Sequence, residues 1–101
     1  MNTKSEMDKL AELLEKDGVA FERFHDPTKV PDYVLPNKDV ERELRNQIII
    51  KQGETVLSFI CHIGSYGVEQ GLIEFYDYES EPVGYLTADE CMKIVKEKLI
   101  L

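Results

Sequence analysis

Apolar residues near the start of the chain recur at intervals of three and four positions, which is the spacing of one helical stripe. The stripe consists of Met7, Leu10, Ala11 and Leu14. Thr3 and Glu6 have the spacing of a capping box, and Asp17 and Gly18 provide a stop signal. These positions predict a helix over residues 4–16.

A second stripe near the end of the chain predicts a closing helix. Thr87 is followed three residues later by Glu90, which is again the spacing of a capping box. The apolar positions of this stripe are Ala88, Cys91, Met92, Val95 and Leu99. Lysines gather near its expected C-terminal end, where the helix dipole favours positive charge.

Between the two expected helices, short segments are rich in β-branched and aromatic residues, which is typical of strands. The predicted strands are residues 19–24, 47–51, 54–62 and 72–78, with a further short edge strand at 83–86. Gln52 and Gly53 predict a two-residue hairpin turn. Because side chains alternate along a strand, Leu57 and Phe59 are expected on the core face. The opposite face would then carry Val56, Ser58, Ile60 and His62.

Residues 25–46 are predicted to form a long connection over the surface. Pro27, Pro31 and Pro36 each lack a backbone N–H donor, and each disfavours helix in the residue before it. A helical turn is expected within residues 39–45. Basic residues in this stretch are interleaved with acidic ones, so it predicts no nucleic-acid-binding patch.

The order of these elements predicts one domain over residues 1–101 with an α+β fold. The chain has 101 residues, which is close to the commonest size of a single domain. Consecutive strands with short links pair antiparallel, and amphipathic helices cover one face of such a sheet. We expect an antiparallel sheet of three to five strands with the N- and C-terminal helices packed on one face.

The charge of the chain is strongly asymmetric. The sequence has 20 Asp and Glu against 12 Lys and Arg, a formal net charge of −8, and no Lys or Arg lies between Lys51 and Lys93. The carboxylates of this interval are Glu54, Glu69, Glu74, Asp77, Glu79, Glu81, Asp89 and Glu90. Because phosphate contacts come from Lys and Arg, we expect no direct nucleic-acid binding. The acidic interval predicts either a basic protein partner or a solvated face that only keeps the protein soluble.

The sequence does not match the known signatures of metal-binding or cofactor-binding sites. Cys61 and Cys91 are too few and too far apart for a disulfide framework or a zinc site. The glycine-bearing loop after residue 62 has neither the dinucleotide nor the P-loop spacing. Residues 77–81 alternate oxygen ligands as a calcium loop does, but Pro82 stands where glycine is required. We therefore expect no cofactor and no metal ion.

Three motifs resemble a group of small, uncharacterised proteins encoded on phages and prophages of Gram-positive bacteria. The motifs are His62-Ile-Gly-Ser-Tyr-Gly67, Gly71-Leu-Ile-Glu74 and Gly84-Tyr-Leu-Thr-Ala-Asp-Glu90, within a resemblance that covers residues 47–97. No activity is established for this group, so the resemblance implies no catalytic residue. It implies a setting in which small acidic phage products bind host proteins, including nucleases and proteins of restriction or CRISPR defence.

The expected location is the cytoplasm, which would be that of the host cell if the protein is phage-encoded. No apolar run reaches the length of a membrane-spanning helix, so we expect no membrane association. The first residues also carry carboxylates where a secretory signal would have an apolar run.

Together these observations predict a small acidic, non-enzymatic protein-binding module, an inhibitor that imitates nucleic acid and blocks a basic host nuclease or defence protein. If extended, Asp77, Glu79 and Glu81 would project from one strand edge about 6.8 Å apart, beside tyrosines that serve as aromatic anchors. The expected partner-binding residues are Glu69, Glu74, Tyr76, Asp77, Tyr78, Glu79, Glu81, Tyr85, Asp89 and Glu90.

Two alternatives stay open at this point. A structural or assembly protein would homodimerise through Val56 and Ile60, or by pairing an open sheet edge. A small enzyme would use His62 as a general base poised by Glu74. The polar site of that enzyme would comprise Ser58, His62, Ser65 and Tyr66.

Overall fold

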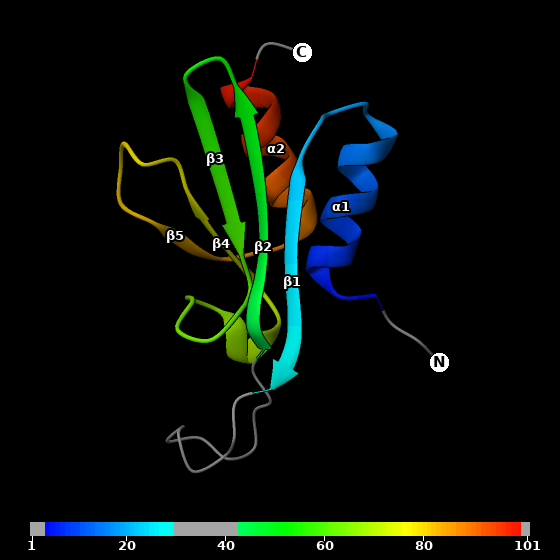
Figure 1. Ribbon diagram of the computed structural model, residues 1–101. Helices are drawn as coiled ribbons and strands as arrows, with labels where there is room; N and C mark the ends of the chain where they lie inside the picture. Colours follow the sequence, from blue (N-terminus) through cyan, green and yellow to red (C-terminus); the bar gives the residue numbers. More distant parts are fainter. Residues whose placement is uncertain (1–3, 30–42, 100–101) are drawn as a thin grey trace.

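The computed structural model describes residues 4–29 and 43–99, which form an antiparallel sheet of five strands in the order β1-β2-β3-β4-β5. In chain order the elements are α1 (Glu6–Lys16), β1 (Glu22–Lys29), β2 (Glu43–Gln52), β3 (Thr55–Ile60), the 3₁₀ helix η2 (Val68–Gln70), β4 (Ile73–Tyr76), β5 (Val83–Leu86) and α2 (Ala88–Lys98). Both α-helices contact the sheet and each other, and β2 and β3 lie in front of α2 in Figure 1. The predicted α+β fold is confirmed.

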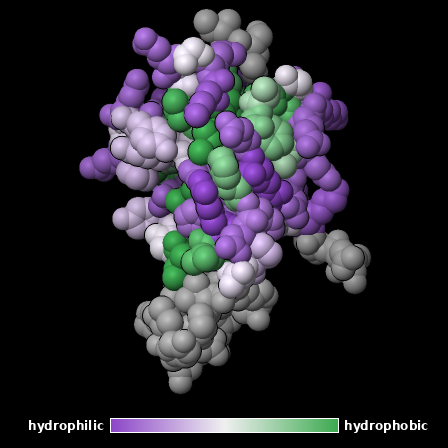
Figure 2. All heavy atoms as spheres, in the orientation of Figure 1, coloured by the Kyte–Doolittle hydropathy of each residue, from purple (hydrophilic) through white to green (hydrophobic). Residues whose placement is uncertain are grey.

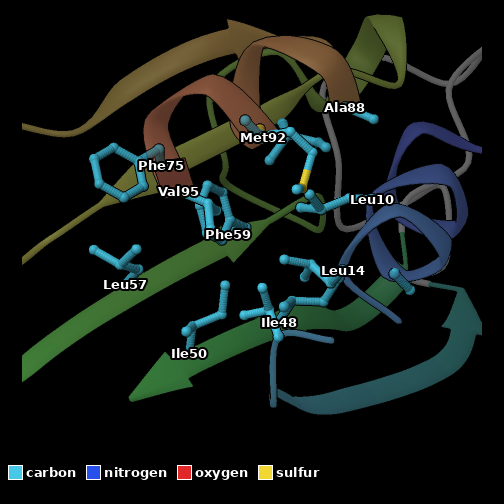
Figure 3. Close-up of a cluster of buried hydrophobic side chains, with 14 of the residues drawn as sticks. Leu10, Leu14, Ile48, Ile50, Leu57, Phe59, Phe75, Ala88, Met92 and Val95 are labelled. Atoms are coloured by element: carbon cyan, nitrogen blue, oxygen red, sulfur yellow. The ribbon is translucent and has the colours of Figure 1, made fainter. Parts of the chain in front are cut away.

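The core lies between the helices and one face of the sheet. The predicted stripes of both helices are buried, and Figure 3 shows their side chains meeting those of β2, β3 and β4. Phe59 is fully buried at the centre of this cluster, and its ring lies 5.1 Å from that of Phe75. With 11 residues each, α1 and α2 are too short to cross a membrane.

The two helices are joined where they begin. Glu6 was expected to cap its own helix together with Thr3, but its Oε1 accepts a hydrogen bond of 2.9 Å from the backbone N–H of Ala88, at the start of α2. Ser5 caps α1 instead, because its Oγ accepts from the backbone N–H of Asp8. Thr3 lies outside the described residues. The capping box predicted for α2 is confirmed.

The predicted connection over 25–46 is wrong at both ends. Strand β1 continues to Lys29 and β2 begins at Glu43, so the helical turn expected over 39–45 is strand in its last three residues. Pro27 is tolerated because β1 is an edge strand and its pairing with β2 is irregular between Asp26 and Lys29. The remainder of the predicted connection, residues 30–42 with Pro31 and Pro36, lies outside the described residues.

The hairpin between β2 and β3 exists, but its turn is one residue later than predicted. Gln52 pairs with Thr55, so the two turn residues are Gly53 and Glu54. Gly53 has φ of 60°, a left-handed conformation that glycine adopts without a steric penalty. The next strand is also shorter than predicted, because β4 ends at Tyr76 and not at Tyr78.

Candidate functional site

The carboxylates between Lys51 and Lys93 do not form one continuous surface. Asp89 and Glu90 occupy the first turn of α2, whereas Asp77 contacts Lys98 at the last turn of that helix. Asp89 and Glu90 precede Lys98 by nine and eight residues, which is a rise of about 12–14 Å along the helix. Glu90 is also engaged locally, because its Oε1 accepts from the backbone N–H of Thr87. The single anionic patch that the sequence suggested is therefore divided.

Asp77 does not project from a strand edge as predicted. Its side chain is buried, and Oδ1 accepts hydrogen bonds of 3.0 Å from the backbone N–H groups of Glu79 and Ser80. Its Oδ2 forms a 2.9 Å ion pair with the Nζ of Lys98. The evenly spaced row of Asp77, Glu79 and Glu81 is thus wrong, because the chain turns at Asp77 instead of continuing β4.

These contacts make Asp77 a pH-sensitive part of the fold. The backbone N–H of Glu79, followed by the Lys98 ammonium and the N–H of Ser80, holds the pKa of the Asp77 carboxyl well below its usual range. In the unfolded chain the pKa is about 3.9. The stabilisation is therefore complete above that value and is lost as the pH falls toward the folded pKa.

We expect the Asp77→Asn variant to be less stable than the native protein at pH 7 and to approach it in acid. Asparagine cannot form the ion pair with Lys98, but below about pH 3 the native carboxylate also loses part of its advantage. Urea unfolding of both proteins at about pH 7 and about pH 2.5 measures this. A difference in unfolding free energy that stays constant between the two pH values would contradict the assignment.

A hollow of about 490 Å³ opens beside the turn at Asp77, and we call it the edge groove. One wall consists of Glu54, Thr55, Val56 and Leu57, and the other of Asp77, Tyr78, Glu79 and Lys98. Strand β4 pairs only with residues 58–60 of β3, so within the described sheet no strand pairs with residues 55–57 on the side away from β2. The edge groove thus follows an uncovered stretch of β3.

The backbone at Tyr78 explains why the groove stays open. Tyr78 has φ of 65°, which non-glycine residues rarely adopt, and this conformation ends the extended path of β4. The hydrogen bonds of Asp77 to the following backbone and its ion pair with α2 hold the chain in that turn. The chain after Tyr76 therefore leaves the path of β4, with Asp77 bound to Lys98 of α2, and residues 55–57 of β3 stay unpaired on that side.

The predicted aromatic anchors fall into two places. The rings of Tyr76 and Tyr78 lie 4.6 Å apart, and Tyr78 is 55% exposed at the edge groove. Tyr85 and Tyr66 border a different hollow, of about 260 Å³, beside η2 and Glu69. The structure therefore places Tyr78 at the acidic groove with the Tyr76 ring beside it, and places Tyr85 and Glu69 elsewhere.

The residues proposed as a catalytic site form structural contacts instead. The Nδ1 of His62 accepts a hydrogen bond of 3.1 Å from the backbone N–H of Asn46. The proton of the neutral ring therefore lies on Nε2. Burial, followed by the nearby charge of Arg45, lowers the pKa of His62, and the nearby Glu74 opposes this effect. A neutral ring with Nδ1 already occupied has no free lone pair with which to accept a proton. This arrangement disfavours His62 as a general base.

The other polar candidates are likewise engaged. The Oε1 of Glu74 accepts a hydrogen bond of 3.0 Å from the backbone N–H of Tyr66. Among the described residues, no hydrogen bond joins Glu74 to His62. Ser65 is buried, and its Oγ donates to the carbonyl of His62 at 2.8 Å. Ser58 accepts from the side-chain amide of Gln47 at 3.0 Å. The contacts of Glu74 and Ser65 hold the loop after β3 in place, and that of Ser58 joins β3 to β2.

Neither cysteine is activated as a nucleophile. Burial raises the pKa of the Cys61 thiol to about 11 and that of the Cys91 thiol to about 12. The reactive thiolate is therefore scarce at neutral pH. Over residues 4–29 and 43–99, no three His, Cys, Asp or Glu side chains come together as a metal site.

Sequence reasoning missed a hollow of about 710 Å³ that contains Arg23, His25, Arg45 and His62. Its charged side chains contact other residues of the protein. Arg23 forms a 2.8 Å ion pair with Asp8, and the guanidinium of Arg45 lies 4.2 Å from the centre of the Phe24 ring. His25 contacts the carboxylate of Glu43. Arg23 and His25 thus contact carboxylates, whereas Arg45 is exposed and keeps its positive charge beside the Phe24 ring.

Sequence reasoning also missed Lys98 and the free residues of β3 as parts of a site. Lys98 was interpreted only as a cation that suits the end of a helix, and its contact with Asp77 spans 21 positions. Comparison of the chain with models of protein families, with curated proteins and with solved structures gave no match.

Proposed function

We propose that this chain is a non-enzymatic protein-binding module that uses the edge groove to bind a basic partner protein. The observation that carries the proposal is the charge of the groove beside an uncovered strand. The groove is lined by three carboxylates and one ammonium group, which belong to Glu54, Asp77 and Glu79 and to Lys98. Because Asp77 and Lys98 neutralise each other, the exposed carboxylates of Glu54 and Glu79 are left to face a partner.

The exposed ring of Tyr78 gives the groove an aromatic surface as well as charge. Tyrosine is enriched in protein interfaces because it buries a large area and keeps a polar tip. Its ring face also attracts Lys and Arg side chains. Glu81 extends the negative charge along the exposed loop that follows Tyr78. Attraction of this kind increases the rate of encounter with a basic protein and weakens as salt is added.

The proposed class of partner is a nuclease or another nucleic-acid-binding protein, because such proteins carry basic grooves. The resemblance to phage proteins favours the same class, and we propose that the interaction takes place in an infected bacterial cell. We propose inhibition by occupation of the basic groove. Close imitation of a phosphate backbone is not part of the proposal, because Asp77 is buried and paired with Lys98.

The test compares two variants of equal net charge. The groove variant combines Glu54→Gln, Glu79→Gln and Glu81→Gln, and the control combines Glu12→Gln, Glu15→Gln and Glu22→Gln on α1 and β1. At about 50 mM NaCl we expect the groove variant to bind a basic nuclease about tenfold more weakly than the native protein, and the control to change by less than about threefold.

Isothermal titration against a panel of basic nucleases, repeated at about 300 mM NaCl, measures both affinity and its dependence on salt. Equal losses in the two variants would mean that only the net charge matters. That result, or an affinity indifferent to salt, would contradict the proposal.

A homodimer is the second candidate, and the uncovered face of the sheet favours it. Ile49, Val56, Ile60 and Tyr76 are only half-buried on the side away from the helices. Figure 2 shows hydrophobic spheres in the middle of this side, surrounded by hydrophilic ones. Sedimentation equilibrium distinguishes the two candidates, because a dimer would form as the concentration rises.

A further inference from the structure

We propose that the partner contributes an extended segment with basic side chains, which pairs with β3 along Thr55–Leu57 and prolongs the sheet through the edge groove. This inference rests on the proposed binding of a basic protein and specifies how the contact is made. Addition of a strand to an open sheet edge is a recurring mode of peptide recognition, in which main-chain hydrogen bonds provide affinity.

Strand β3 has a free edge over Thr55–Leu57. On one side, Thr55, Val56 and Leu57 pair with Gln52, Lys51 and Ile50 of β2. On the other side, β4 pairs with β3 only from Ser58 onward. In an antiparallel ladder, alternate residues direct their N–H and C=O groups to alternate sides. Part of this stretch of β3 therefore presents main-chain groups to the groove, where a further strand could pair with them.

The fold keeps this position vacant. If β4 continued straight, residues 77 and 78 would pair with Leu57 and Val56. The buried Asp77 carboxylate instead binds Lys98 and the backbone of residues 79 and 80, and the left-handed turn at Tyr78 follows. Asp77 and Lys98 thus act as positioning residues that hold the groove open.

The other edges of the described sheet differ from this one. The outer edge of β1 carries Pro27 and a shift of register between Asp26 and Lys29, and both features discourage a new strand. The outer edge of β5 is bent at Tyr85, where φ is 60°. Residues 55–57 have a regular register with β2 and no proline.

The charges beside the free edge fix the chemistry of the segment. Glu54 lies at one end of the free edge and Glu79 on the opposite wall, both exposed. Side chains of an added strand would alternate between the two faces of the sheet. Lys or Arg at alternate positions would therefore place positive charge near these carboxylates and near the ring of Tyr78, whereas an acidic strand would be repelled.

The experiment uses peptides and leaves the protein unchanged. The probe is an acetylated and amidated peptide of alternating lysine and valine, about seven residues long, which is enough to cover three residues of β3 at about 3.4 Å per residue. Two further versions carry N-methyl groups on the odd or on the even amides. A third replaces every lysine by glutamate.

Strand pairing predicts that one N-methylated peptide binds at least about tenfold more weakly than the parent, while the other stays within about threefold. The reason is that only one set of amides faces β3. The glutamate peptide should not bind. In ¹⁵N–¹H spectra of the protein, the amides of residues 54–57 and 77–79 should shift with the parent peptide.

Several outcomes would overturn the inference. They are failure of the parent peptide to bind, equal affinity or equal loss for both N-methylated peptides, and shifts confined to β1 or to the uncovered sheet face. The proposed function is judged separately, by the two charge variants with a basic nuclease. A groove-dependent loss there, with equal behaviour of the N-methylated peptides here, would retain the acidic binding surface and reject strand pairing.

Discussion

The Phe59→Ala variant should lose about 3–5 kcal/mol of unfolding free energy. Phe59 is fully buried in β3, the central strand of the sheet, and its ring packs on Phe75. Removing the ring forfeits its burial and leaves a cavity between the sheet and α2, which cannot close without moving both layers. A domain of this size has about 5–15 kcal/mol of stability in total, so the variant should be marginally folded.

Urea unfolding monitored by circular dichroism measures this loss. Leu44→Ala is the matched control, because Leu44 is 51% exposed on β2 and should change stability by less than about 0.5–1 kcal/mol. A loss below about 1 kcal/mol for Phe59→Ala would mean that the core described here does not hold the sheet and helices together.

The Gly84→Ala variant should lose about 2–3 kcal/mol, by overpacking and not by a cavity. A Cβ atom at position 84 would lie 2.3 Å from the Cβ of Tyr66 and 2.9 Å from its carbonyl oxygen. The backbone of β5 or of the loop after β3 would therefore have to move. The 3.4 Å hydrogen bond from the N–H of Tyr85 to the carbonyl of Tyr66 would be strained by the same movement.

A double-mutant cycle with Tyr66→Gly identifies this contact as the cause. Removing the Cβ of Tyr66 relieves the closest approach, so the cost of Gly84→Ala should fall in the Tyr66→Gly background. Val83→Ala on the same strand is the control, because Val83 is half exposed. Additive losses in the cycle would contradict the proposed clash.

Local signals in the sequence were sufficient to predict much of the fold. The helical stripes, the capping box at Thr87 and the two-residue hairpin all depend on residues within a few positions of one another. For the helical stripes, pattern and position agree because the same residues both define the element and bury its apolar face, whereas the hairpin turn lies one residue later than predicted. The edge strand β5 was predicted on the same basis.

Predictions failed where a distant contact decided the outcome. Glu6 has the spacing of a capping residue for α1, yet it bonds to Ala88, 82 positions away. Asp77 continues an alternating acidic pattern, yet Lys98 and the following backbone draw it into a turn. Ala88 and Lys98 are too far away in the sequence for a local spacing to indicate these contacts. Because Asp77 is drawn into the turn, the expected row of carboxylates does not form.

The motifs that carried the resemblance have a structural role in this fold. Gly84 packs against Tyr66, and Glu74 accepts the backbone N–H of the same tyrosine. His62 and Ser65 close the turn between β3 and η2. These contacts bring segments from all three motifs together in one packed loop.

The central claim is that the edge groove is the surface that recognises a basic partner. Titration of ¹⁵N-labelled protein with a basic nuclease, followed residue by residue in ¹⁵N–¹H spectra, tests it most directly. The account predicts that the changes concentrate on residues 54–57 and 77–79, on the two walls of the groove. Changes confined to the uncovered sheet face around Ile49 and Ile60, or to the helices, would contradict it.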